Sequence, residues 1–201
     1  MPFVLWLLAG AVLLISFDQF ALFRTINGHY SPFLNELMFH ATKMGQAEVI
    51  IPVLAGLMLL KKYRNWWYFT LATASNVIPM LLQQSLKSIF DKPRPMHYFE
   101  HTTWLHILEN WDRVFERSFP SGHTQGAFSF FCFLSILLPQ RYRMVGAVLF
   151  LLALLVGYSR VYLAAHFVAD VYAGSIIGAL GTPIVFVLMS KYVRRYFPIT
   201  S

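Results

Sequence analysis

Six apolar segments constrain the fold of this chain more than any other feature of its sequence. Hydrophobic residues make up 57% of the 201 residues and charged residues 12%, whereas soluble domains average about 45–50% and about 25%. A chain of this length has too much surface to bury so many apolar side chains in water. This apolar composition excludes three classes of protein: a soluble enzyme, a disordered protein and a nucleic-acid-binding arm. The segments lie at about residues 2–17, 45–60, 66–86, 123–138, 144–162 and 167–190.

Each segment is predicted to be a transmembrane helix, because backbone polar groups surrounded by lipid need partners within their own segment. The first segment has neither a basic start nor a following cleavage site of small residues, so we interpret it as a retained helix. The predicted fold class is all-α: a polytopic membrane protein with six transmembrane helices and short interfacial helices in its outward loops. We expect a single domain over residues 1–201. The lone Cys132 can form no internal disulfide and leaves the redox compartment undecided.

The distribution of charge predicts the orientation of these helices. Six spans place both termini on one side, together with eight Lys and Arg residues and no acid; the other side holds eight bases, all nine acids and all seven histidines. The first set lies in very short connections, where basic residues mark the cytoplasmic side most strongly. We therefore expect a multi-pass protein of the cell (inner) membrane with cytoplasmic termini. The cytoplasmic bases are Lys61, Lys62, Arg64, Arg141, Arg143, Lys191, Arg194 and Arg195.

Two longer loops, residues 18–44 and 87–122, lie on the outward side. From Trp104 to Phe115, apolar residues recur every three to four positions among charged ones, which predicts an amphipathic helix on the bilayer surface. A plain connecting helix is the alternative. The stretch 96–119 is the part most expected to select a lipid. Glu48, at the outward start of the second segment, either pairs with a cation of the site or lies at the interface.

Three polar clusters lie at the outward ends of the segments, where ionisable groups are costly and indicate a functional site. The first contains Lys87 and Arg94-Pro95. The second is Pro120-Ser121-Gly122-His123, and the third runs from Ser159-Arg160 through His166 to Asp170. Each cluster alone has a structural explanation, such as a helix cap or a structural His–Asp pair. Their occurrence together, on one side of the membrane, favours a shared site.

The cations of these clusters indicate an anionic ligand with several oxygens. Arg forks contact phosphate at two points, and Lys supplies a point charge. Arg94, Arg160 and Lys87 come from different parts of the chain. Ser121 and Gly122 precede a predicted helix, whose free N–H groups form an anion site that glycine lets a ligand approach closely. A phosphoryl group fits this set.

The remaining residues predict nucleophilic chemistry on that phosphoryl group. His166 and Asp170 are four apart, so a helix places them on one face. The carboxylate can then hold one imidazole nitrogen and leave the other free for attack. His123, with a pKa near 6.5 in its ordinary state, can protonate a leaving oxygen. Metal binding by His and Asp is the competing interpretation, and the neighbouring cations argue against it because they repel a metal.

The three clusters resemble the three-part signature of the phosphatidic acid phosphatase type 2 superfamily, and the resemblance covers about residues 44–190. It implies a metal-independent lipid phosphate phosphatase of bacterial type that needs no cofactor and forms a phosphohistidine, with its site facing the periplasm or exterior. By this resemblance His166 is the nucleophile, Asp170 its partner and His123 the acid. The phosphate binders it implies are Lys87, Arg94, Ser121, Gly122 and Arg160.

The expected partners are a lipid phosphate substrate and membrane lipids, with no nucleic acid; the oligomeric state is left open. The resemblance implies phosphatidylglycerol phosphate, phosphatidic acid, undecaprenyl diphosphate or lipid A phosphates as substrates, with undecaprenyl diphosphate or a related bacterial lipid slightly favoured. Three alternatives stay open. They are a lipid phosphotransferase of the same family, a catalytically silent phospholipid-binding or transport protein, and a metal-dependent hydrolase.

Overall fold

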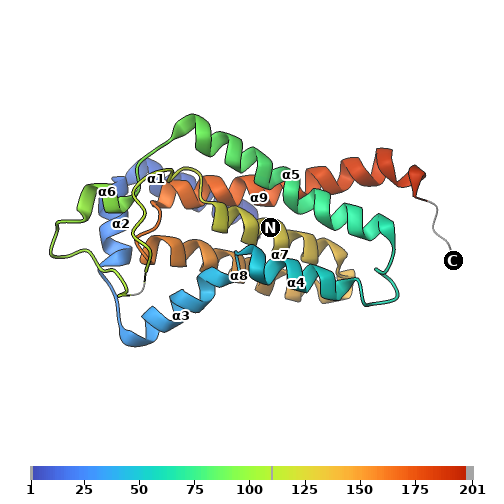
Figure 1. Cartoon of the computed structure of the whole chain (residues 1–201), viewed down its shortest axis with the longest axis horizontal. Coiled ribbons are helices and arrows are strands. Elements are labelled where there is room, and N and C mark those ends of the chain that lie inside the picture. The colour runs from blue at the N-terminus through green and yellow to red at the C-terminus, as the bar shows by residue number, and fades with distance from the viewer. Residues whose placement is uncertain (1, 110, 198–201) are drawn as a thin grey trace.

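The computed structural model describes residues 2–109 and 111–197, and every regular element in them is helical. All six predicted segments form helices, with ends close to those predicted. Shorter helices occupy the two longer loops, residues 18–44 and 87–122 (Figure 1). The six segments form α1 (Pro2–Ser16), α4 (Ala47–Leu57), α5 (Trp66–Phe90), α7 (Gly122–Leu137), α8 (Arg143–Tyr162) and α9 (Val168–Leu188), and the loops hold α2 (Gln19–Asn27), α3 (Pro32–Lys43) and α6 (Pro95–Phe99).

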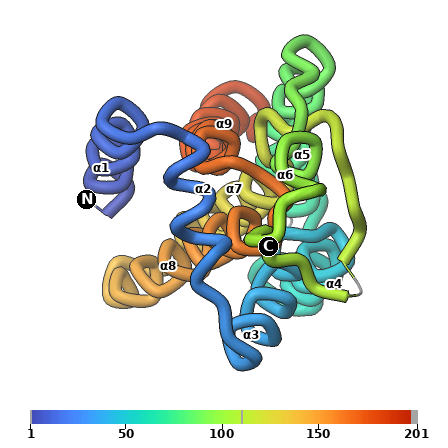
Figure 2. The backbone as a smooth tube through the Cα atoms, turned by 90° about the vertical axis from the view of Figure 1, so that its left-hand side faces the viewer, coloured from blue at the N-terminus to red at the C-terminus, as the bar shows by residue number. Residues whose placement is uncertain are grey.

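The helix α7 occupies the middle of the bundle, with α5, α8 and α9 around it and α1 at the periphery (Figure 2). Close packing of α7 against α9 depends on small residues. A Cβ atom at Gly174 or Gly178 of α9 would collide with the backbone carbonyls of Ser121 or Gln125 in α7. Small residues let helix backbones approach each other in this way. The result is that the N-terminal ends of α7 and α9 meet.

Length and hydropathy give fewer membrane spans than predicted. Among the described residues, two helices are long and apolar enough to cross a membrane, Gln140–Tyr162 and Val168–Tyr196; α1 and α2, bent by 111°, make a third if they count as one span. The helix α5 has 25 residues but carries polar side chains such as Asn76, Gln83 and Lys87. The predicted number of six spans is therefore not confirmed by this criterion, although each predicted segment is helical.

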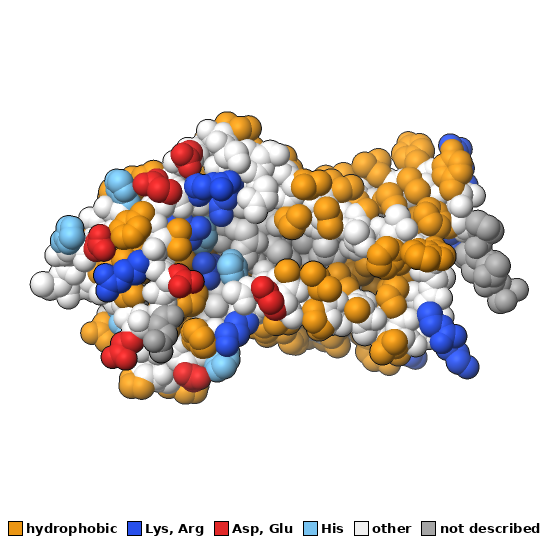
Figure 3. Space-filling model, viewed as in Figure 1, with side chains coloured by type: hydrophobic (Ala, Val, Ile, Leu, Met, Phe, Trp, Pro, Cys, Tyr) orange, Lys and Arg blue, Asp and Glu red, His pale blue; other side chains and the backbone are white. Residues whose placement is uncertain are grey.

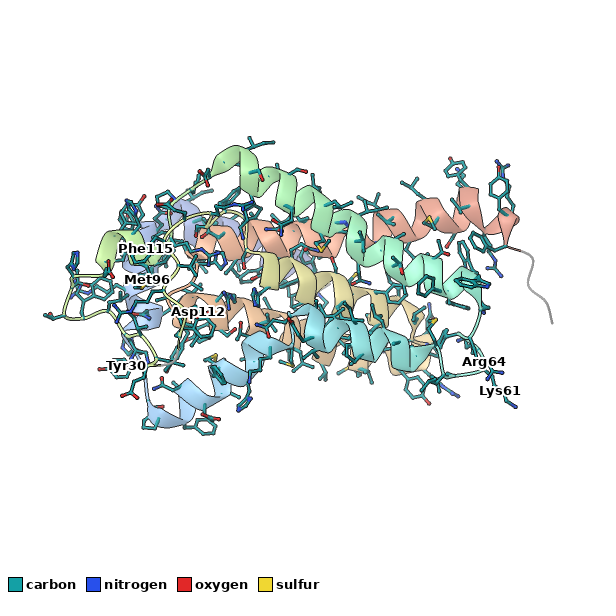
Figure 4. All side chains as sticks on the ribbon, in the orientation of Figure 1. Tyr30, Lys61, Arg64, Met96, Asp112 and Phe115 are labelled. Carbon is teal, nitrogen blue, oxygen red and sulfur yellow. The ribbon has the colours of Figure 1, made fainter. Side chains whose placement is uncertain are left out.

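The visible acids and histidines and many of the Lys and Arg side chains gather toward one end of the elongated bundle, over α2, α3, α6 and the loops (Figure 3). Apolar side chains cover much of the face beyond them, and further Lys and Arg side chains lie at the opposite end (Figure 3). Lys61 and Arg64 lie at the opposite end from Asp112 and Phe115 (Figure 4). The molecule thus has two polar ends separated by an apolar section. This is the distribution that a bilayer requires of a protein that crosses it.

The prediction of an amphipathic helix from Trp104 to Phe115 is wrong, because the described residues of this stretch form an irregular loop. Its backbone binds other elements instead of itself. The amide of His106 donates to Asn27 at 2.9 Å, Asn27 donates back to the His106 carbonyl at 2.8 Å, and the Phe115 carbonyl accepts from the Arg94 amide at 2.7 Å. The recurring apolar side chains pack inward against α2, α8 and the start of α9 rather than onto a bilayer surface.

Candidate active site

His166 lies in the short connection between α8 and α9, and Asp170 lies in the first turn of α9. Both are almost fully buried, and His166 Nδ1 is 3.5 Å from Asp170 Oδ2. The same carboxylate oxygen accepts a hydrogen bond from the Phe167 amide at 2.9 Å, so Asp170 also holds the start of its own helix. Burial lowers the pKa of His166 to about 3. The imidazole is therefore neutral near pH 7, and the orientation of Nδ1 toward Asp170 leaves Nε2 free.

Ser118 completes this cluster and was not predicted from the sequence. Its hydroxyl donates to Asp170 Oδ2 at 2.5 Å and lies 3.4 Å from His166 Nδ1. Its own amide donates to the Lys92 carbonyl at 2.7 Å, which fixes the residue in the loop. The one sequence signal for Ser118 is its place two residues before the Pro120–His123 cluster. Its fully buried position depends on how the loop folds over α9.

The Pro120–His123 cluster begins α7 and contacts the third cluster directly. The Ser121 amide donates to the Asp170 carbonyl at 3.0 Å, while the Ser121 side chain caps α7 by accepting from Thr124. Gln83 of α5 holds the preceding Pro120 carbonyl at 2.8 Å. His123 Nε2 is buried and has no hydrogen-bond partner among the described residues. An unpaired buried nitrogen of this kind is expected where a ligand supplies the partner.

The three predicted cations converge on this cluster from different elements. Arg94 donates to the carbonyls of Ala165 at 3.1 Å and Glu116 at 2.8 Å, and burial lowers the pKa of its guanidinium below the usual range. Lys87, in the last turn of α5, lies near enough to Arg94, Arg160 and Asp170 for their charges to act on it. All three predicted clusters are therefore brought together at one end of the bundle.

Arg160 is held by Thr42, which the sequence did not single out, and by Trp111 of the stretch expected to select a lipid. Its Nη1 donates to the Thr42 hydroxyl of α3 at 2.7 Å, and its guanidinium carbon lies 5.3 Å from the centre of the Trp111 ring. The side chain is 5% exposed, and its Nε has no hydrogen-bond partner within residues 2–109 and 111–197. Arg160 thus retains an unused donor. Nothing in the sequence relates α3 to α8, so these contacts depend on tertiary packing.

A cavity of about 390 Å³ opens beside these residues. Arg94, His123 and Arg160 line it, whereas His166 and Asp170 are not among its described lining residues.

The other predicted residues have separate places. Ser121 is used as a helix cap, and Gly122 begins α7, where an added Cβ atom would lie 3.5 Å from the Gln83 side chain. No group of three or more His, Cys, Asp or Glu side chains in the described ranges is arranged to hold a metal ion. Glu48 is exposed and has no ion pair within the described part of the chain.

Comparison with known proteins identifies the family. The undecaprenyl-diphosphatase of Sulfolobus acidocaldarius is 33% identical over 158 residues, which cover 79% of this chain and 72% of that protein. Phosphatidylglycerophosphatase B of Bacillus subtilis is 31% identical over 160 residues, covering 74% of this chain and 72% of its own length. The crystal structure of Aquifex aeolicus LpxE superposes with a TM-score of 0.72 at 32% identity, covering 85% of this chain and 96% of that one. Residues 65–194 match the PAP2 superfamily; the chain belongs to this superfamily, and its relatives are phosphatases of lipid phosphates.

Proposed function

We propose that this chain is an integral membrane phosphatase that removes a phosphate from a bacterial lipid phosphate or diphosphate, with undecaprenyl diphosphate or a related lipid slightly favoured. One observation carries the proposal: a buried His166 lies against Asp170, next to Arg94 and Arg160. Such an arrangement combines a nucleophile with cations that stabilise the phosphoryl oxygens. No metal or cofactor takes part in the proposed reaction.

In the first step, His166 Nε2 attacks the phosphorus while Asp170 holds Nδ1. The bond between phosphorus and the lipid oxygen breaks, and His123 gives its proton to that oxygen. The negative charge of a bound phosphate favours the protonated form of His123 before this transfer. In the second step, water attacks the phosphohistidine, and His123 takes the proton from that water. His166 and inorganic phosphate are then released, and His123 is again protonated.

Lys87, Arg94, Arg160 and the backbone amide of Gly122 are proposed to bind the phosphoryl oxygens. Ser121 is proposed to position that amide, because its own amide already donates to the Asp170 carbonyl. In a phosphoryl transfer, charge spreads over the three equatorial oxygens, so that positioned donors supply much of the catalysis. Arg160 keeps its buried Nε unpaired among the described residues, which leaves a donor for an oxygen of the substrate. The start of α7 adds the positive end of a helix dipole at the same place.

The proposed topology has six membrane-spanning helices, cytoplasmic termini and a site that faces the periplasm or exterior. Two hydrogen bonds join α5 to the rest of the bundle and support its assignment as a span. Gln83 binds the Pro120 carbonyl, and Thr182 of α9 donates to the carbonyl of Ser75 at 2.9 Å. An apolar cavity of about 600 Å³ between α4, α5 and α7 extends from Gly122 along the bundle. It offers space for a lipid chain next to the site.

The test of this function is release of inorganic phosphate from purified lipid phosphates and diphosphates, with excess chelator present. We expect turnover that persists in chelator and liberates free phosphate. Loss of turnover in chelator would contradict the metal-independent mechanism. Transfer of the phosphoryl group to a lipid acceptor, with no free phosphate, would instead identify a phosphotransferase. Binding without turnover would identify a silent lipid-binding protein.

The Ser118→Ala substitution is expected to lower kcat by about 10–100-fold, because a hydrogen bond to a charged group contributes about 1.5–3 kcal/mol. Without the Ser118 hydroxyl, Asp170 holds His166 less firmly. The KM should change by less than about threefold, since Ser118 does not line the cavity. Steady-state kinetics on one lipid phosphate would measure both constants. The matched control is Ser85→Ala, an exposed hydroxyl on α5 that binds its own helix; equal effects of the two variants would disprove the role of Ser118.

A further inference from the structure

Lys43, the last residue of α3, lines the cavity of the candidate site together with His123, Arg94 and Arg160. Its position is fixed by its neighbours. Thr42 is buried and accepts the hydrogen bond from Arg160 Nη1 at 2.7 Å. Two residues farther along, Gly45 approaches the carbonyl of His123 so closely that a Cβ atom would collide with it. The end of α3 is therefore anchored to the site on both sides of Lys43.

The charge of Lys43 is not neutralised by an acid. Its ammonium lies 4.2 Å from the centre of the Phe39 ring, one turn earlier in α3, and no carboxylate within the described ranges lies within 4.0 Å of it. The cavity contains the cations Lys43, Arg94 and Arg160, against the single acid Asp112. The described lining therefore has a net positive charge. Lys43 is an additional cation there, because, of the cations in this lining, only Arg94 and Arg160 were predicted to bind the reacting phosphate. This surplus of positive charge suits a substrate with more than one phosphate.

In the proposed mechanism, the lipid departs on the side of the site that holds the cavity. In an in-line displacement, the leaving oxygen is opposite the attacking atom. His123, the proposed acid for that oxygen, lines the cavity, whereas the nucleophile His166 is not among its described lining residues. When a lipid diphosphate is cleaved, the leaving group is a lipid monophosphate. Its oxygens then need a cation on this side of the phosphorus.

We propose that Lys43 binds the phosphate that remains on the lipid when a lipid diphosphate is cleaved, and that it makes the enzyme prefer diphosphates to monophosphates. This inference rests on the proposed function. Arg94 and Arg160 contact the transferred phosphoryl group, and Lys43 contacts the phosphate next to it. The bond that breaks joins the transferred phosphorus to the bridging oxygen, which leaves on the lipid monophosphate. His123 protonates that product.

The test compares farnesyl diphosphate with farnesyl monophosphate, two substrates with the same hydrocarbon chain. Initial rates of phosphate release give kcat/KM for the wild type and for Lys43→Gln. We expect Lys43→Gln to lose about 10–100-fold on the diphosphate, since a charged hydrogen bond contributes about 1.5–3 kcal/mol. The loss on the monophosphate should be less than about threefold. Lys43→Arg should retain most of the preference, because it keeps the charge.

Lys92→Gln is the matched control. Lys92 lies in the same outward region, with its ammonium 4.9 Å from the centre of the Phe119 ring, and it does not line the cavity. The Lys92→Gln variant should have the wild-type ratio of kcat/KM for the diphosphate to kcat/KM for the monophosphate. If Lys43→Gln also has the wild-type ratio, or if the wild type prefers the monophosphate, the assignment of Lys43 is wrong, while the proposed function still stands. Failure of the wild type to release phosphate from either substrate would instead contradict the proposed function.

Discussion

Replacing His166 with alanine is expected to reduce phosphate release on the order of 10⁴-fold or more, as removal of a nucleophile does in other enzymes. The side chain is almost fully buried and lies against Asp170. The phosphoryl group would then have no attacking atom within the site. Purified variant and wild-type proteins should be compared on the same lipid phosphate under the same detergent conditions.

A second readout separates loss of the nucleophile from loss of the fold. The wild type, quenched during turnover of a substrate labelled in its phosphate, should carry an alkali-stable and acid-labile phosphoryl group, and the His166→Ala variant should carry none. The matched control is His101→Ala, which removes an exposed histidine from the outward loop and should retain both activity and labelling. Normal turnover by a folded His166→Ala protein would contradict the assignment of His166 as the nucleophile.

The arrangement of the predicted site follows from its helices more than from its loops. Each of the three clusters lies at or near an end of an apolar segment, and the segments alternate in direction, so these ends meet at one end of the bundle. The contact between the Ser121 amide and the Asp170 carbonyl is one result. The glycines of α9 strengthen it by bringing α9 against α7. The apolar segments, the polar clusters at their ends and the glycines of α9 are all local patterns in the sequence. For this reason the predicted residues lie together in the structure.

Ser118 and Thr42 were missed for a different reason. Each acts through a residue distant in the sequence: Ser118 through Asp170, and Thr42 through Arg160. No periodicity relates such pairs, and serine and threonine are common in loops and at helix ends. Their roles become apparent only when the position of α3 and the path of the loop before α7 are known.

The loop from Trp104 to Phe115 shows how a local pattern can mislead. Apolar residues every three to four positions predict a helix when one face packs on a flat surface. Here Trp104 and Leu105 pack beside α2, and Leu108 and Trp111 pack near the end of α8. The exchange of hydrogen bonds between Asn27 and His106 replaces those of a helix. The same packing places Trp111 next to Arg160, so the irregular path contributes a wall to the site.

The effect of replacing His123 with alanine is expected to depend on the leaving group. For an alkyl lipid monophosphate, kcat/KM should fall about 10²–10⁴-fold, the usual contribution of a general acid. For p-nitrophenyl phosphate it should fall less than about tenfold, because nitrophenolate departs without a proton. A lipid diphosphate should give an intermediate loss, since its leaving phosphate is less basic than an alkoxide. His97→Ala, which removes an exposed histidine of α6, is the matched control.

The aryl substrate also separates the two proposed roles of His123. The value of kcat/KM reports the first step, attack by His166. The rate of phosphate release in steady state also depends on the second step, in which water cleaves the phosphohistidine. Without His123 to take the proton from water, the variant should produce a burst of nitrophenolate equal to the enzyme concentration, followed by slow turnover. Equal losses of kcat/KM on aryl and alkyl phosphates would show that His123 acts by binding rather than by proton transfer. Such a result would leave its buried, unpaired Nε2 as a phosphate ligand.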